Sequence, residues 1–292
     1  MSMTDPVGSG LAAAARPTRH ESFLAYDHFR FLKWAAGLLL VSIVLYILVR
    51  PYGEPYGGGW TGYTLGTIGA LLILWLTWFG YRKRTYANNT GRLAARLSAH
   101  VYLGGVLFFV ATLHTGFNFG WNIHTLAYAL MCVVIGSGVF GVFAYARYPR
   151  LMTDNRESMT TGQMMNRIAS IDDDLRGSAM PLDDSTVAAV DRAIETTAIG
   201  GSLWRQLTGR YSDCTTAAAI AHMEAFAEGH TIVQEAWRQT RLKLGEKAAL
   251  LARLRRDIRY KAMMEVWLYL HVPLTFALIA ALAAHVIAIF YM

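Results

Sequence analysis

Long apolar runs separated by short polar connections occupy the first half of the chain, and one further apolar run ends it. Five of these runs are close to the roughly 20 residues that a helix needs to cross a hydrocarbon core, and they exceed the apolar segments of soluble proteins. We predict spanning helices at residues 31–49, 62–80, 99–117, 122–146 and 264–291. The expected fold class is therefore all-α, an integral membrane helical bundle with five transmembrane helices.

The polar pattern divides the chain into four regions. Residues 1–30 lack the apolar core of a cleavable signal peptide, so we expect the first span to act as its own insertion signal. Residues 31–147 hold spans one to four. Residues 148–262 follow a helix break expected at the sequence RYPR and contain charged, amphipathic stretches, which predict a helical cytoplasmic domain inserted between spans four and five. Residues 263–292 form span five, whose helix we expect to begin outside the membrane, at about Glu246.

The basic residues predict the orientation. Of the 27 Lys and Arg, four lie up to Lys33, five lie between Arg82 and Arg96, and seventeen lie between Arg147 and Lys261. Because cationic loops are retained in the cytoplasm, we expect the N-terminus inside the cell and the C-terminus outside. The net charge of +7 also leads us to expect attraction to membrane lipid headgroups,. No nucleic-acid partner is needed to explain it.

Four histidines share one spacing. HVYLGGVLFFVATLH runs from His100 to His114, and HVPLTFALIAALAAH runs from His271 to His285. Fourteen residues fall about 40° short of four helical turns, so the two imidazoles of each helix project from nearly one face, about 21 Å apart along the axis. Spans three and five run in the same direction, which predicts an inner pair, His100 with His271, and an outer pair, His114 with His285. Each pair is suited to hold a haem iron between two axial imidazoles.

Small residues on the other spans occur at matching intervals. Gly66 and Gly80 of span two are fourteen residues apart, and we expect them at the depths of the outer and inner pairs. Ala127 and Gly141 of span four repeat the interval. A flat macrocycle requires neighbouring helices to approach closely, which glycine permits, although small residues also serve ordinary helix packing in membranes.

Paired histidines on two helices, with glycines at matching depth, resemble the cytochrome b family, which includes the cytochrome b of quinol-cytochrome c oxidoreductases and its bacterial b-type relatives. The resemblance covers spans two to five and implies two haem b groups. His100, His114, His271 and His285 would be axial ligands, and Gly66 and Gly80 would contact the haems. It implies an electron-transfer subunit of an oxidoreductase complex in a bacterial inner (plasma) membrane. Its partners would be a cytoplasmic redox protein, quinone, and a periplasmic c-type cytochrome or iron-sulfur protein.

The chain departs from that family in two respects. We expect it to lack the further helices of the larger relatives. The sequence contains no Pro-Glu-Trp-Tyr-type quinone motif, and a domain separates spans four and five. The ferric reductase and NADPH oxidase group places histidines on similar helices, but no flavin, nicotinamide or other nucleotide motif is found here. A ferric-reductase-like transmembrane reductase and a membrane scaffold that recruits partners through its cytoplasmic domain are therefore the alternatives.

Other chemistry is less well matched to the histidines. Two imidazoles supply half of a tetrahedral zinc site, and a proton relay would require acidic residues within the bilayer. A single membrane histidine can also simply form a hydrogen bond with a neighbouring helix. At the outer start of span four, His124 is expected either to contact a haem propionate or to be solvated at the interface.

Overall fold

The computed structural model of the protein describes residues 23–49, 59–83, 90–156, 159–228 and 235–291. These residues are all-α and include no strand. A 3-10 turn, η1 (Phe23–Ala25), is followed by the helices α1 (Tyr26–Val49), α2 (Trp60–Lys83), α3 (Thr90–Thr115), α4 (Ile123–Arg156), α5 (Thr161–Ala179), α6 (Asp184–Glu195), α7 (Leu203–Thr208), α8 (Thr216–Glu228) and α9 (Glu235–Tyr291).

Five helices are long and apolar enough to cross a membrane, namely α1, α2, α3, α4 and α9, the last through its C-terminal part. Each predicted span lies in one of them, apart from one or two residues at its ends, so the all-α class and the five apolar helices are confirmed.

Threonines of α2 show how polar side chains are accommodated. The hydroxyls of Thr64, Thr67 and Thr77 donate to the carbonyl four residues earlier, at 2.8–2.9 Å, which satisfies them without a second helix.

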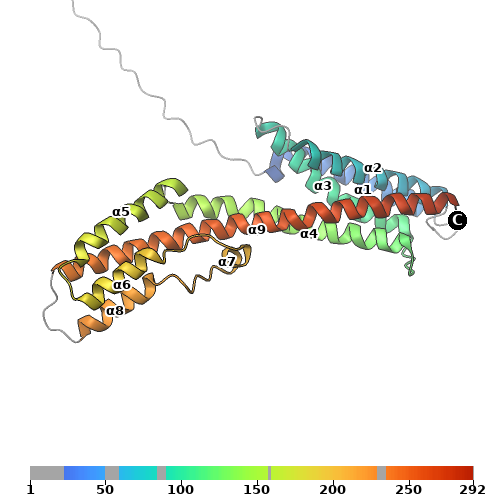
Figure 1. Ribbon diagram of the computed structural model, residues 1–292. Coiled ribbons are helices and arrows are strands. Elements are labelled where there is room, and N and C mark those ends of the chain that lie inside the picture. Colours follow the sequence, from blue (N-terminus) through green and yellow to red (C-terminus); the bar gives the residue numbers. More distant parts are fainter. Residues whose placement is uncertain (1–22, 50–58, 84–89, 157–158, 229–234, 292) are drawn as a thin grey trace, which may run out of the picture.

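The five apolar helices form a bundle at one end of the molecule (Figure 1). α3 packs on α1, α2 and α4, whereas α9 packs closely on α4 and more lightly on α2. α3 and α9 therefore lie at opposite corners of a four-helix arrangement completed by α2 and α4. Buried side chains from all four fill its interior: Ile73, Leu76, Leu107, Met131 and Leu278. Side chains of α3 and α9 can consequently face each other across the bundle.

The other end of the molecule is a helical domain in which α5, α6, α7 and α8 surround the N-terminal part of α9 (Figure 1). Its core is apolar and includes Met164, Ile171, Leu175, Met223 and Leu251. Lys247 is fully buried in this domain, where its ammonium pairs with Asp172 at 2.6 Å and donates to the Ala193 carbonyl at 2.8 Å. The predicted helical insertion is thus present, and its cytoplasmic location remains a prediction.

The helix break expected at RYPR is absent, so that prediction is wrong. α4 continues through Pro149 to Arg156. A proline removes only one backbone donor, and close packing along α9 favours continuation of the helix. The predicted extension of span five is confirmed and is longer than expected, because α9 is continuous from Glu235 through Pro273.

A buried polar network joins the end of α4 to α9. Asp257 is 2% exposed, and its carboxylate accepts a hydrogen bond from the Asn155 amide at 2.8 Å and another from the Arg156 guanidinium. The Asn155 amide also donates to the Arg253 carbonyl at 2.7 Å, and its oxygen accepts from Arg256 at 2.8 Å. These contacts fix the last turn of α4 against α9 at the boundary between the bundle and the helical domain.

Candidate functional site

His114 and His285 meet across the bundle, at the end where α9 finishes. Their ring centroids are 6.0 Å apart and their planes are inclined at 74°. His114 lies in the last turn of α3, which ends where Gly116 and Phe117 adopt left-handed conformations with φ of 56° and 62°. His285 lies two turns before the end of α9. The structure therefore brings together the two residues that the sequence predicted as the outer pair.

The tautomer of His114 is determined by its hydrogen bond. Its Nδ1 is 2.8 Å from the backbone carbonyl oxygen of Gly62 in α2. A carbonyl can only accept, so Nδ1 carries the hydrogen and donates it. In the neutral ring, Nε2 then holds the lone pair. Histidines that bind a metal commonly donate their other N–H to such an oxygen.

His285 is in contact with a second histidine as well. Its Nδ1 lies 2.7 Å from Nδ1 of His124, at the start of α4, and the ring centroids are 4.6 Å apart. One of the two nitrogens donates to the other. Sequence reasoning considered His124 only as a propionate partner or as a solvated residue, and it missed this contact because nothing in a single helix specifies which side chain of another helix it will meet.

The absence of a side chain at Gly66 leaves room for the His114 ring. A Cβ added to Gly66 would lie 2.8 Å from Cε1, 3.1 Å from Nδ1 and 3.3 Å from Nε2 of the imidazole. Atoms at van der Waals contact are about 3.5–4.0 Å apart, so a larger residue would displace the ring. Gly69, one turn further along, is different, because its added Cβ would meet only a Leu107 methyl at 3.9 Å. The structure thus places Gly66 at the depth of His114, as the sequence predicted.

A cavity of about 640 Å³ opens beside these histidines. It lies among α2, α3, α4 and α9, and His114, His124 and His285 are part of its wall. Most of the lining is apolar, while Asn118, Asn122 and Thr125 add polar groups near the α3–α4 connection. This volume lies within the roughly 300–1,000 Å³ of cofactor and ligand pockets.

This end has two features that a haem site requires. A metal bound in line by two imidazole nitrogens at about 2 Å each has ring centroids roughly 6 Å apart, and the His114 and His285 rings show a similar separation. The cavity supplies apolar walls and a few polar groups beside the pair. Among the residues that the structure describes, no group of three or more His, Cys, Asp or Glu could hold a metal ion. A haem requires only two protein ligands, so this result does not bear on it.

His271, at the other level of α9, is oriented by α4. Its Nδ1 lies 2.7 Å from the Ser137 hydroxyl oxygen, and that hydroxyl also lies 2.7 Å from the Val134 carbonyl. Because the carbonyl can only accept, Ser137 donates to it and must accept from His271. Trp267 packs against the same imidazole with ring centroids 5.2 Å apart, and its indole N–H donates to the Ser137 carbonyl at 2.6 Å.

The remaining predicted site residues are placed as follows. His100 is half-buried in α3, and its pairing with His271 remains a prediction. Gly80 lies in α2, but its surroundings are outside the part of the chain that the structure describes. Gly141 is buried against Trp267, whose ring atoms would lie only 2.2–2.8 Å from an added Cβ. The observed neighbour of Gly141 is therefore the indole, and its contact with a cofactor is untested.

Ser137 and Trp267 are functional candidates that sequence reasoning missed. The available signal was a hydroxyl and an indole N–H in otherwise apolar helices, since such groups need a partner in lipid.

Searches against protein-family models, curated proteins and solved structures found no match to this chain. The candidate site is thus defined by its own geometry.

Proposed function

We propose that the chain is a di-haem b-type cytochrome that relays electrons across a membrane as a subunit of an oxidoreductase complex. One observation supports this proposal above the others. Three of the four histidines spaced fourteen residues apart have Nδ1 engaged by a neighbouring helix: His114 by Gly62, His271 by Ser137, and His285 by His124. This pattern leaves Nε2 as the nitrogen for a metal at His114 and His271, and it is typical of metal-bound histidines.

The residues have separable roles in this proposal. His114 and His285 would hold one haem, and His100 and His271 the other. A bound haem supplies reversible one-electron chemistry, and its potential is set by axial ligands, hydrogen bonds and burial. Two histidine ligands would leave no open position for substrate on each iron, which favours electron transfer over substrate activation. Gly66 leaves room for the His114 ring, and the Ser137 hydroxyl accepts the Nδ1 hydrogen of His271 and so determines its tautomer.

We further propose that the chain lies in a bacterial inner membrane with its N-terminus and its α5–α8 domain on the cytoplasmic side. The seventeen basic residues between Arg147 and Lys261 support this orientation,. A cytoplasmic redox partner would dock on the helical domain. Quinone, a c-type cytochrome or an iron-sulfur protein would exchange electrons at the opposite face.

The primary experiment is an absorption spectrum of the purified protein before and after reduction with dithionite. We expect the sharp alpha band of a low-spin b haem and about two haems per chain by pyridine haemochrome analysis. A colourless preparation that binds no added haemin would contradict the proposal and favour the scaffold alternative.

Variants test the ligand pairs. Replacement of His114 or His285 by Ala should remove one haem, and replacement of His100 or His271 should remove the other. His222 serves as a control, since its ring contacts Ser185 in the helical domain and its replacement should leave both haems. Loss of the same haem from His100→Ala and His285→Ala would show that the pairs are assigned wrongly.

A further inference from the structure

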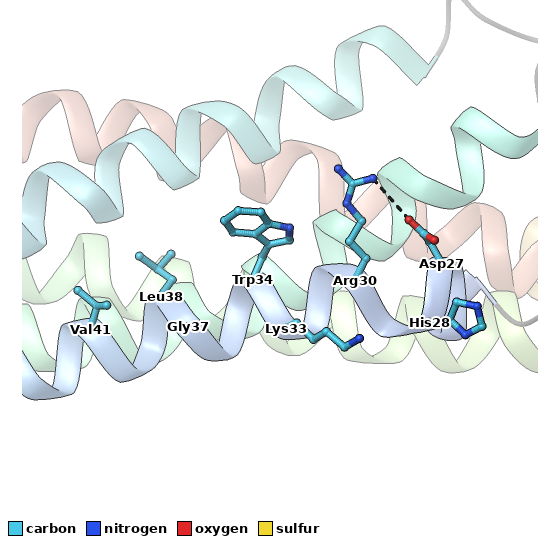
Figure 2. Close-up of a pocket in the computed structure, with 8 residues that line it drawn as sticks. All are labelled: Asp27, His28, Arg30, Lys33, Trp34, Gly37, Leu38 and Val41. Atoms are coloured by element: carbon cyan, nitrogen blue, oxygen red, sulfur yellow. Dashed lines mark hydrogen bonds and ion pairs between the residues drawn. The ribbon is translucent and has the colours of Figure 1, made fainter.

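The first turns of α1 carry a groove that the electron-transfer proposal does not use. The groove has a volume of about 760 Å³ and is lined by residues of α1 alone: Asp27, His28, Arg30, Lys33, Trp34, Gly37, Leu38 and Val41. Figure 2 shows Arg30, Trp34, Leu38 and Val41 rising from one side of the helix, with Lys33 on the adjacent side. One end of the groove is charged and the other is apolar.

Helical geometry explains why these residues share a face. From Arg30 onward α1 is regular, so Arg30, Trp34, Gly37 and Val41 project within about 60° of one another. Ala35 lies on the face that packs on the bundle, and Leu38, at the edge of the groove, also packs on that cluster. Trp34 and Val41 are 69% and 63% exposed. In a helix that spans a membrane, this stripe would face lipid.

The order of residues along the stripe matches the layers of a membrane. Arg30 and Lys33 lie near the start of the span, where cationic side chains meet headgroups, and Trp34 follows at the depth where aromatic residues gather. From Arg30 to Val41 the helix rises about 16 Å, which is about half of the hydrocarbon layer. Gly37, halfway along the stripe, has no side chain and is exposed, and a Cβ added there would meet no atom within 4 Å.

The charges favour an anion over a neutral headgroup. Arg30 and Lys33 contribute two positive charges, and Asp27, which pairs with Arg30 at 3.5 Å, contributes one negative charge. The groove is therefore net positive with His28 neutral. We propose that it binds one anionic phospholipid, with the phosphate at Arg30 and Lys33 and an acyl chain along Gly37 and Val41. This site is independent of haem binding and of which membrane face the N-terminus occupies.

The test measures binding of phosphatidylglycerol and phosphatidylcholine to the detergent-solubilised full chain by native mass spectrometry. We expect the wild type to bind phosphatidylglycerol at least tenfold more tightly. Each basic residue near an anionic lipid surface raises the affinity about fivefold. The affinity of the double variant Arg30→Gln, Lys33→Gln for phosphatidylglycerol should therefore be about 25-fold lower. The matched control is Arg147→Gln, Arg150→Gln, which removes the same charge from exposed positions of α4 and should change binding less than threefold.

Two further variants separate the headgroup from the acyl chain. Gly37→Leu adds a side chain at a position where an added Cβ meets no atom within 4 Å, and it should weaken the binding of both lipids. Asp27→Asn should strengthen phosphatidylglycerol binding several-fold, and Asn suits the left-handed conformation of residue 27, where φ is 48°,. Equal binding of the two lipids by the wild type would overturn the proposal. So would a Gly37→Leu variant that binds as the wild type does, or an Asp27→Asn variant that binds more weakly.

Discussion

Replacement of Gly66 by Ala is the sharpest perturbation of the histidine pair at the end of α9. The new methyl group would lie 2.8 Å from Cε1 of His114, well inside van der Waals contact, so the ring must move by roughly 0.7 Å or more,. That movement acts on the 2.8 Å hydrogen bond to the Gly62 carbonyl. Donor–acceptor distances much beyond about 3.2 Å weaken such a bond steeply.

The expected cost has two parts. Steric overlap of an added methyl group with a neighbouring side chain costs about 1–3 kcal/mol, and a lost hydrogen bond adds about 1 kcal/mol. Loss of the hydrogen bond that orients a metal-bound histidine commonly lowers metal affinity by about 10–100-fold. We therefore expect Gly66→Ala to lose the haem held by His114 and His285, so that the haem content falls from about two per chain towards one.

Pyridine haemochrome analysis with redox titration measures this outcome. Gly69→Ala is the matched control, because its methyl group meets only Leu107 at 3.9 Å, and it should retain both haems. Retention of one haem by Gly66→Ala distinguishes a local effect from unfolding. A Gly66→Ala protein with the haem content and potentials of Gly69→Ala would refute the reasoning.

Two other predictions concern the helical domain and its connection to the bundle. Asp257→Asn removes a buried charge that accepts two hydrogen bonds, so we expect a loss of about 2–3 kcal/mol and a fall in Tm of roughly 5–10 °C,. Asp173→Asn, at an exposed ion pair, should change the Tm little, and equal shifts would contradict this prediction,. Burial opposes ionisation of the Cys214 thiol, but hydrogen bonds from Thr216 and others outweigh it and lower the pKa to about 7. In a Cys132→Ala background, alkylation by iodoacetamide should therefore accelerate as the pH rises through about 7, and a midpoint above 8.5 would contradict the assignment.

Properties of single helices were predictable from the sequence. The apolar runs predicted the five apolar helices. The fourteen-residue interval, taken with the parallel direction of spans three and five, predicted that His114 and His285 share a level. The same interval placed Gly66 beside His114. Which side chains meet within one level was not predictable. Whether Ser137 or another residue of α4 meets His271 depends on the rotation of both helices, and no pattern within one of them encodes it.

At Pro149, packing between α4 and α9 outweighs the local preference for a helix end. A proline after an aromatic residue and before an arginine is a reasonable helix end, yet α4 continues for two more turns. Those turns bring Asn155 and Arg156 to the buried carboxylate of Asp257. Contacts made far along the chain thus compensate for the backbone hydrogen bond that the proline removes. The residues of α9 that make these contacts lie about one hundred residues further along the chain.

The hydrogen bonds of the histidines also bear on the choice between electron and proton transfer. A histidine that relays protons must pass a proton in at one ring nitrogen and out at the other. The Nδ1 hydrogen of His114 is donated to a backbone carbonyl, which has no proton to exchange. That of His271 is donated to Ser137, whose own hydrogen is committed to the Val134 carbonyl. Both rings are thereby fixed in one tautomer with Nε2 as the basic nitrogen. An arrangement that immobilises a proton on one side of the ring and presents a lone pair on the other suits a metal ligand better than a proton carrier, which agrees with the proposed electron transfer.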